Sequence, residues 1–450
     1  MRFSLGNGRP ATGRTAIAVA MLGGLLAMFL RWYFVTHAQV LQPLFRDSNW
    51  GDAGQYYRYA WNLFHHGLFS SAAPGSANPI SDGFRDPAYP VFLALGMAIT
   101  DNYDHWYTLV ILSQTVLGAV TVTCVILAIR DALPTWLLVV AALAMAVWPH
   151  LVSIPAYVLS ENLTAPLCAI SALALREAAV RRSMGYVLVA GVSMALAALS
   201  NAVLGPLAVV LACTFASKRS LPPRLLLVLV AVSTLPLLAW GIRNSHLTAP
   251  LSPAIRVEMN LVQGSWPTYH AAAQLASVED PVGVQTIDAM NLEMATLHID
   301  RVEGLKAMAA RMGHAPGTYL AWYLSKPALL WGWEIGLGAG DIYMYPTHNS
   351  PFVTNPIFKA IEAVTFIFNG VLALLALAGL IVVALRRDPP AALITFAVTA
   401  AWVTVVYGVL QSDPRYSTPY RAAEIVLACV AVSFIVTYLR KRVVGTQDPS

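Results

Sequence analysis

The sequence predicts an all-α polytopic membrane protein. Apolar residues form 57% of the chain, above the ~45–50% of an ordinary soluble protein, and charged residues form 11%, against roughly 25%. The apolar residues gather in long runs that separate a few polar segments, which is the pattern of membrane-spanning helices. The net charge of +5 comes from loops beside these runs, so it indicates membrane orientation and no nucleic-acid partner.

About ten runs approach the ~20 apolar residues of a membrane span. They cover residues 15–36, 106–129, 133–150, 161–176, 185–199, 203–217, 224–242, 358–385, 391–410 and 421–439. The runs 185–199 and 203–217 are interpreted as two passes, because basic residues flank both ends of the pair. The first run has no small-residue cleavage site after it, so we expect a retained span and not a removed signal peptide.

The basic residues predict the orientation of the chain. With a cytoplasmic N-terminus, the cytoplasmic loops hold more than half of the 28 Lys and Arg residues but few of the 23 Asp and Glu residues. Short loops rich in Lys and Arg stay in the cytoplasm. We therefore expect a multi-pass protein of the cell (inner or plasma) membrane with both termini cytoplasmic. Residues 1–450 would form one module, with segments 37–105 and 243–357 on the extracytoplasmic side.

The two outer segments contain further predicted helices. Residues 51–66 place apolar side chains at helical spacing and predict an amphipathic helix in the membrane interface. Residues 87–99 are apolar but too short to span, so they predict a second interfacial helix. Residues 71–87 between them are rich in Ser, Ala, Pro and Gly and predict a loop. In the second segment, the pattern of residues 293–312 indicates helical structure.

Several short motifs follow one another in a specific order. They are Gly51-Asp52-Ala53 with Tyr56 and Ala60, Arg85-Asp86-Pro87 with Tyr89-Pro90, Ser160-Glu161-Asn162, Arg243-Asn244, and Arg415-Tyr416 with Pro419. In this order they resemble the C-type (GT-C) glycosyltransferases, in particular the protein-mannosyltransferase-like and aminoarabinose-transferase-like branch, which uses polyprenyl-phosphate sugars. The chain departs from that pattern at Ala53, where many members have a second acid.

The resemblance implies a GT-C-like bundle of about ten transmembrane helices with interfacial helices in the first outer loop. It also implies inverting transfer of a sugar from a polyprenyl-phosphate donor to an acceptor lipid, glycan or protein, with an extracytoplasmic active site. Such a reaction needs a carboxylate that deprotonates the acceptor hydroxyl and guanidinium groups that stabilise the departing phosphate. Asp52 is the candidate base, and the alternative is an acid that only favours the start of its helix.

Other residues are candidates for binding. Arg85, Arg58, Arg415 and Arg243 would hold the donor phosphate, and Glu161, Tyr56, Asp86 and Tyr416 would bind the rest of the substrate. Arg421 frames the start of the last span together with Arg415 and is a candidate of the same kind, whereas Arg243 and Lys326 are weaker candidates. For the basic residues, the alternative is pairing with nearby acids, such as Asp413 and Glu424, or with lipid headgroups.

No cofactor is assigned with certainty. A divalent cation is conceivable among Asp47, Asp52, Asp82, Asp86, Asp101 and Asp104, but their spacing matches no known ligand loop, so no metal site is predicted. The four cysteines lie in apolar runs without metal-ligand spacing and are expected to be inert thiols.

Two other functions fit parts of the sequence. A polymerase or ligase that uses a polyprenyl-diphosphate-linked glycan would also need an outer loop with arginines. A secondary transporter would usually show paired halves with broken helices and ionisable residues near the middle of the spans, and the sequence shows neither clearly.

Overall fold

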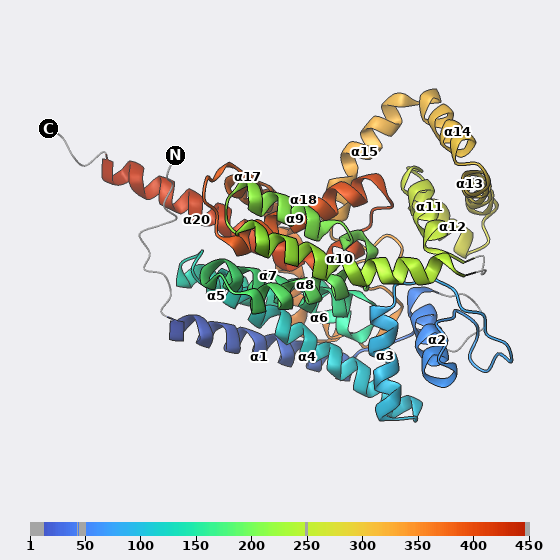
Figure 1. The fold of residues 1–450 in the computed structure, drawn as a ribbon, viewed down its shortest axis with the longest axis horizontal. Helices are drawn as coiled ribbons and strands as arrows, with labels where there is room; N and C mark the ends of the chain where they lie inside the picture. The colour runs from blue at the N-terminus through green and yellow to red at the C-terminus, as the bar shows by residue number, and fades with distance from the viewer. Residues whose placement is uncertain (1–12, 43, 45–50, 248–250, 446–450) are drawn as a thin grey trace.

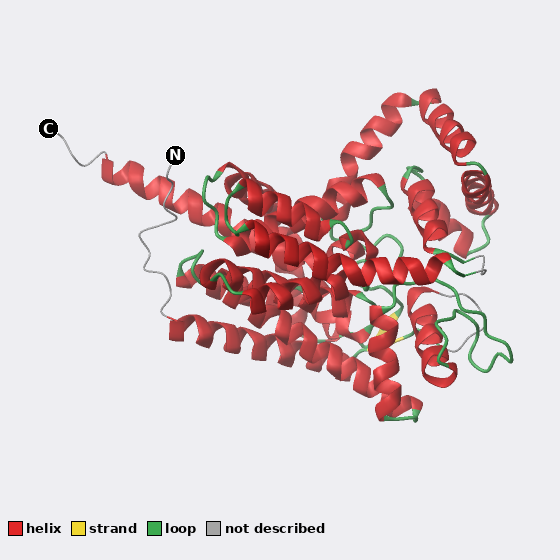
Figure 2. Ribbon diagram, in the orientation of Figure 1, coloured by secondary structure: helices red, strands yellow, loops and turns green. Residues whose placement is uncertain are grey.

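The protein is a bundle of helices in the computed structural model, which describes residues 13–42, 44, 51–247 and 251–445 (Figures 1 and 2). Helices α1 (Gly13–His37) and α20 (Arg421–Gly445) begin and end, respectively, at one end of the bundle. Helix α2 (Gly51–His66) and the five helices that follow α10 lie at the opposite end. The all-α fold class is confirmed, and the two segments expected outside the membrane lie at the same end.

The remaining elements are helical apart from one short antiparallel pairing, β1 (Gln39–Val40) with β2 (Thr347–His348), which links the two polar segments. The helices are α3 (Ala88–Ile99), α4 (Tyr103–Ile129), α5 (Thr135–Val147), α6 (Pro149–Ser153), η1 (Ile154–Ala156), α7 (Glu161–Arg181), α8 (Met184–Ala198), η2 (Ala202–Leu204), α9 (Leu207–Ser217), α10 (Pro223–Ser245), α11 (Pro253–Gly264), α12 (Tyr269–Ser277), α13 (Pro281–Ile299), α14 (Arg301–His314), α15 (Pro316–Leu330), α16 (Pro351–Thr354), α17 (Pro356–Leu385), α18 (Ala391–Val409), α19 (Pro414–Ser417) and η3 (Thr418–Tyr420).

Within the described residues, seven helices are long and apolar enough to cross a membrane, or eight if the bent pair α5 and α6 is one span. Every one of the ten predicted runs contains a helix, so the multi-pass architecture is confirmed. Helix α8 and the stretch 202–217 are apolar but short. Helix length therefore supports fewer full spans than the ten that hydropathy predicts.

The predicted span 133–150 is broken, with a bend of 56° between α5 and α6. Pro149 has no N–H to donate to the carbonyl oxygen of Met145, one turn earlier. The Arg31 side chain, buried on α1, donates instead to Met145 at 3.1 Å and to Ala146 at 3.5 Å. Arg31 thus satisfies backbone groups that lipid would leave without a partner.

Helix α8 brings part of the first polar segment into the bundle. Its 15 residues rise about 22 Å, less than the ~30 Å of a bilayer core. Helix α8 is therefore too short to be a full span on its own, and a turn follows it. There the Leu199 carbonyl accepts the Ala88 N–H at 2.9 Å, and the Ala202 N–H donates to Asp86 at 3.1 Å. These bonds fix the segment that directly follows Arg85.

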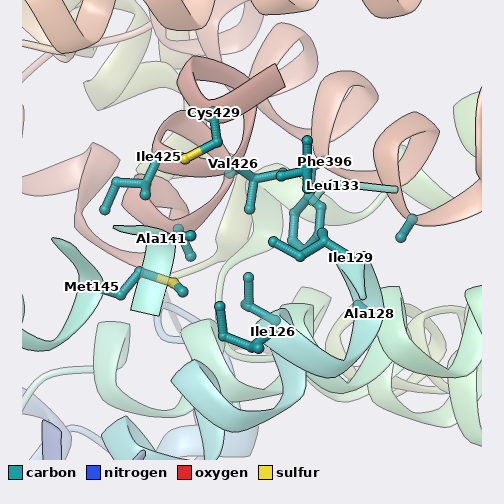
Figure 3. Packing of buried hydrophobic residues seen from close by; sticks show 14 of the residues in the cluster. Ile126, Ala128, Ile129, Leu133, Ala141, Met145, Phe396, Ile425, Val426 and Cys429 are labelled. Carbon is teal, nitrogen blue, oxygen red and sulfur yellow. The ribbon is translucent and has the colours of Figure 1, made fainter. Parts of the chain in front are cut away.

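The largest buried cluster lies among α1, α4, α5, α18 and α20 (Figure 3). Ile126 and Ile129 from α4 face Met145 from α5, while Phe396 and Val426 approach from α18 and α20. In lipid, close packing rather than exclusion of water holds such helices together. This cluster supplies the rigid frame from which the polar end of the bundle is built.

Helices α11 to α15 (residues 253–330) form a cap that projects from the polar end (Figure 1). Residues 293–312 are helical, as predicted, but they belong to two helices, because the chain breaks at Asp300. The Asp300 carboxylate accepts the N–H groups of Val302 and Glu303 and begins α14 as an N-cap. Arg311 on α14 then binds Glu293 on α13 with two hydrogen bonds of 3.0 and 3.1 Å.

Lys326 joins the cap to the bundle. Its side chain is fully buried, and its ammonium group donates to the Gly264 carbonyl at 2.9 Å and to the Leu410 carbonyl at 2.5 Å. These carbonyls stand at the C-terminal ends of α11 and α18, where the helices leave them without partners. The Gln411 N–H also donates to the Asn260 carbonyl at 2.9 Å. Lys326 is therefore a structural cation and not an exposed one.

We predict that Lys326→Met lowers the midpoint of thermal unfolding of the purified protein. The substitution removes the Lys326 donor from the Leu410 carbonyl, which costs about 1–3 kcal/mol for an unsatisfied buried group, whereas the Gly264 carbonyl keeps the Trp322 N–H at 2.9 Å. The control is Lys306→Met, since the Lys306 side chain on α14 is 70% exposed. Equal midpoints for the two variants would contradict the role assigned to Lys326.

Candidate functional site

The candidate site is centred on Asp52 in the first turn of α2. Gly51 precedes it with a φ of +71°, and a Cβ there would lie 2.7 Å from the Tyr345 hydroxyl, so the position requires glycine. One oxygen of the Asp52 carboxylate pairs with Arg85, which lies before α3. The other pairs with the Arg415 guanidinium, on α19, at 2.5 Å. Three distant parts of the chain therefore meet at one carboxylate.

The two arginines control the charge of Asp52. Burial alone would raise the pKa of Asp52, but the charges of Arg85 and Arg415 outweigh it and hold that pKa well below its usual value. In turn, Asp52 raises the pKa of Arg85 above its usual value in spite of burial, which lowers it. Asp52 is therefore ionised at any ordinary pH, and in this arrangement it is a weak base.

Arg415 also binds a second carboxylate. Its Nε donates to Glu161 Oε1 at 2.8 Å, and Glu161 is buried at the start of α7. A guanidinium group that lies between two carboxylates is held in both position and orientation. The structure thus brings together four of the residues selected from the sequence, namely Asp52, Arg85, Arg415 and Glu161.

The first turns of α2 hold Arg85 on its other side. Its Nε donates to the Gln55 side-chain oxygen at 2.7 Å, and its guanidinium lies 5.1 Å from the centre of the Tyr56 ring. The Tyr56 hydroxyl donates to Ser160 at 3.0 Å, next to Glu161. Tyr56 thus lies beside Arg85 and Ser160. Gln55 was missed, because an exposed-looking amide in a helix carries no signal in the sequence.

Tyrosines from other segments line the same place. The Tyr345 hydroxyl accepts the Ala53 N–H at 3.2 Å. Burial raises the pKa of Tyr345 and of Tyr269 to about 12 in each case, and the Asp52 charge contributes. Tyr416 stacks on Tyr407 with ring centres 5.1 Å apart. These phenols stay protonated, so they are able to donate hydrogen bonds to a polar substrate.

Asp413 positions Arg415 without pairing with its side chain. One Asp413 oxygen accepts the Arg415 N–H at 2.8 Å and caps α19, and the other accepts the Gly336 N–H at 3.1 Å. His270 from the cap faces that second oxygen at 3.6 Å and binds the Ser412 carbonyl at 2.9 Å. The backbone that presents Arg415 is therefore fixed from two sides.

Other predicted residues make different contacts. Asp86 pairs with Arg256 of α11 at 2.6 Å, so it bridges the first outer segment and the cap. Arg243 donates to the Asp82 carbonyl at 2.5 Å and lies 4.7 Å from the Trp240 ring centre. Arg58 is buried on α2.

Two further candidates from the sequence have structural partners. Arg421 pairs with Glu424 at 2.7 Å, and both side chains are buried, which is the alternative expected from the sequence. Lys326, as described above, binds backbone carbonyls.

No group of three or more His, Cys, Asp and Glu side chains among the described residues is arranged to hold a metal ion. Asp47 lies outside the described residues. The Asp82 carboxylate accepts the Ser71 N–H and hydroxyl at 2.8 and 2.6 Å. Asp101 and Asp104 are exposed near the start of α4. The positive charge between Asp52 and Glu161 is supplied by Arg415.

No protein-family model and no curated protein matches the chain. Among solved structures, the chain is similar to the oligosaccharyltransferase AglB from Archaeoglobus fulgidus in complex with an inhibitory peptide and a dolichol-phosphate, with a TM-score of 0.46 and 16% identity over 97% of this chain. It is also similar to ArnT from Cupriavidus metallidurans bound to undecaprenyl phosphate, with a TM-score of 0.40 and 14% identity over 92% of this chain.

The chain spans 52% of the AglB chain and 76% of the ArnT chain. At these identities and scores, the similarity concerns the fold, and the function proposed below rests on the geometry around Asp52.

We predict that Asp86 and Arg256 stabilise the fold as a pair. Both side chains are mostly buried, at 16% and 15% exposure, so the coupling energy in a double-mutant cycle should be about 1–3 kcal/mol. Asp86→Asn and Arg256→Met should each lower the unfolding midpoint, and the double variant should fall little further. Additive effects of the two substitutions would contradict the pairing and favour a substrate-binding role for Asp86.

Proposed function

We propose that the protein is an integral-membrane inverting glycosyltransferase that moves a sugar from a polyprenyl-phosphate donor to an acceptor lipid, glycan or protein on the extracytoplasmic face. The observation that carries the proposal is the Asp52 carboxylate held between the Arg85 and Arg415 guanidinium groups. Acceptor deprotonation and phosphate departure need these two kinds of group side by side.

Each residue has a role in this proposal. Asp52 accepts the proton of the acceptor hydroxyl. Arg85 and Arg415 bind the donor phosphate and stabilise the charge that it gains as the glycosidic bond breaks. Glu161, which orients Arg415, also faces sugar hydroxyls, and the Tyr345 and Tyr269 hydroxyls donate to the substrate. The segment 37–105 is then catalytic, and the segment 243–357 covers the substrate.

The charged side chains of the site are partly accessible, which supports the proposal that a ligand binds there. The side chains of Asp52, Arg415 and Arg85 are 27%, 17% and 13% exposed, so the charged cluster is open to a ligand although it is mostly enclosed. Partial enclosure strengthens electrostatic interactions with a phosphate, because less water screens them. The short α8 lets residues 85–88 enter the bundle, which would bring Arg85 close to the headgroup level of a lipid-borne substrate.

The proposal includes an orientation of the protein in the membrane, which is based on its basic residues. We place both termini in the cytoplasm and the polar end of the bundle outside, in the cell membrane, because basic residues are concentrated in the short loops at the end where α1 begins. Arg31 binds carbonyls and Arg421 pairs with Glu424 inside the spans, so these buried charges do not favour a transporter over an enzyme.

We predict that Asp52→Asn lowers the transfer rate about 10²–10⁴-fold, the range that general-base catalysis contributes. The assay uses purified protein, a panel of radiolabelled polyprenyl-phosphate sugars and envelope extract as the source of acceptor, and measures the release of polyprenyl phosphate. Asp104→Asn, an exposed acid at the start of α4, is the control and should retain the rate. Full turnover by the Asp52 variant would exclude this mechanism. Consumption of only diphosphate-linked donors would favour a polymerase or ligase.

We further predict that Arg85→Lys and Arg415→Lys each raise the KM for the donor about tenfold. Lysine keeps the charge but loses the planar fork that binds two phosphate oxygens. Steady-state kinetics at saturating acceptor measure the effect. An unchanged KM in both variants would mean that the donor phosphate binds elsewhere.

A further inference from the structure

The Asp52 cluster has its opposite charges already paired. Each Asp52 oxygen pairs with a different arginine, and each arginine uses its Nη2 group for that pairing. Arg85 donates its Nε to Gln55, and Arg415 donates its Nε to Glu161. A phosphate that binds both arginines through these Nη2 groups therefore competes with Asp52 for them.

The same pairing conflicts with a basic role for Asp52. The two guanidinium groups hold the pKa of Asp52 well below its usual value, whereas burial alone would raise it. A carboxylate in that state takes up a proton poorly. If both arginines stayed in place throughout the reaction, the base would be least effective at the moment when it is needed.

Separation of Asp52 from its two arginines would remove both the competition and the low basicity. This inference rests on the function proposed above. We propose that the donor phosphate displaces Asp52 from Arg85 and Arg415, so that Asp52 becomes an effective base only after the donor has bound. Binding of the first substrate thus activates the group that acts on the second one.

The charges balance through the reaction. The acceptor O–H bond breaks and its proton moves to Asp52, while the acceptor oxygen bonds to the anomeric carbon. The bond from that carbon to the phosphate oxygen breaks, and its electron pair stays on the phosphate. A singly charged phosphodiester thereby becomes a phosphomonoester with one more negative charge, held by Arg85 and Arg415, while Asp52 becomes neutral. When the lipid phosphate leaves, both arginines return to Asp52 and drive its proton off.

The sizes of the interactions allow such an exchange. A phosphate replaces both contacts of Asp52 with similar ones and offers more oxygens to the two planar forks. The difference in free energy between the arginines bound to Asp52 and the arginines bound to the phosphate is therefore small. Removal of the competing carboxylate should strengthen phosphate binding by a measurable amount.

The test measures the affinity of farnesyl phosphate, a short isoprenyl phosphate without a sugar, for the purified full-length chain by calorimetry. Asp52→Asn should bind this probe about tenfold more tightly than the parent protein, a change of about 1.4 kcal/mol. Asp104→Asn removes the same charge from an exposed position and should leave the affinity unchanged. A second variant, Glu161→Gln, also frees Arg415 and should bind the probe about threefold more tightly, so the test does not depend on one substitution.

The outcomes separate the two proposals. Unchanged or weaker binding by both the Asp52 and Glu161 variants, with the parent protein binding the probe, would overturn the competition and leave the transferase proposal intact. No binding by the parent protein or by any variant would overturn the phosphate site itself. Tighter binding by Asp52→Asn together with loss of transfer would be hard to obtain if Asp52 only stabilised the fold.

Discussion

The structure depends on one interaction, the double ion pair that joins Asp52 to Arg85 and Arg415. It connects α2 to the segment before α3 and to the short α19 near the end of the chain. Contacts from neighbouring segments hold these three elements in position. The turn after α8 holds the residues after Arg85, and Asp413 holds the backbone of Arg415. Without this support, two long flexible side chains would pay a considerable entropy cost to meet one carboxylate.

The buried basic residues fall into two groups with different consequences. Arg31 and Lys326 donate to backbone carbonyls at helix ends, so they stabilise breaks and termini that lipid cannot hydrogen-bond. Arg85 and Arg415 pair with carboxylates at a place that stays partly accessible. The first group is fixed by the fold, whereas the second is able to exchange one anion for another. This distinction, and not charge alone, identifies the candidate phosphate ligands.

Hydropathy located the helices well, because a span must be a continuous apolar run whatever its neighbours are. The amphipathic pattern also predicted α2 with its observed limits. The sequence did not reveal the bend at Pro149 or the break at Asp300, since both depend on single residues inside apolar or mixed runs. Asp52, Arg85, Glu161 and Arg415 were selected as candidates because each lies in a short motif of the sequence. Tyr345, Tyr269 and His270 were missed, because their contacts with Ala53, with the charge of Asp52 and with Asp413 form only when distant segments of the chain fold together. Likewise, the partner of Asp86 is 170 positions away in the chain, so its role as a bridge had no local signal.

The central claim is that one phosphate site is shared between the substrate and Asp52. Its most direct test is an experimental structure of the full-length protein with farnesyl phosphate bound. The account predicts a phosphate within hydrogen-bond distance of both Arg85 and Arg415, with Asp52 no longer bonded to both. A phosphate bound elsewhere, for example beside Arg243, with both ion pairs of Asp52 intact, would contradict it.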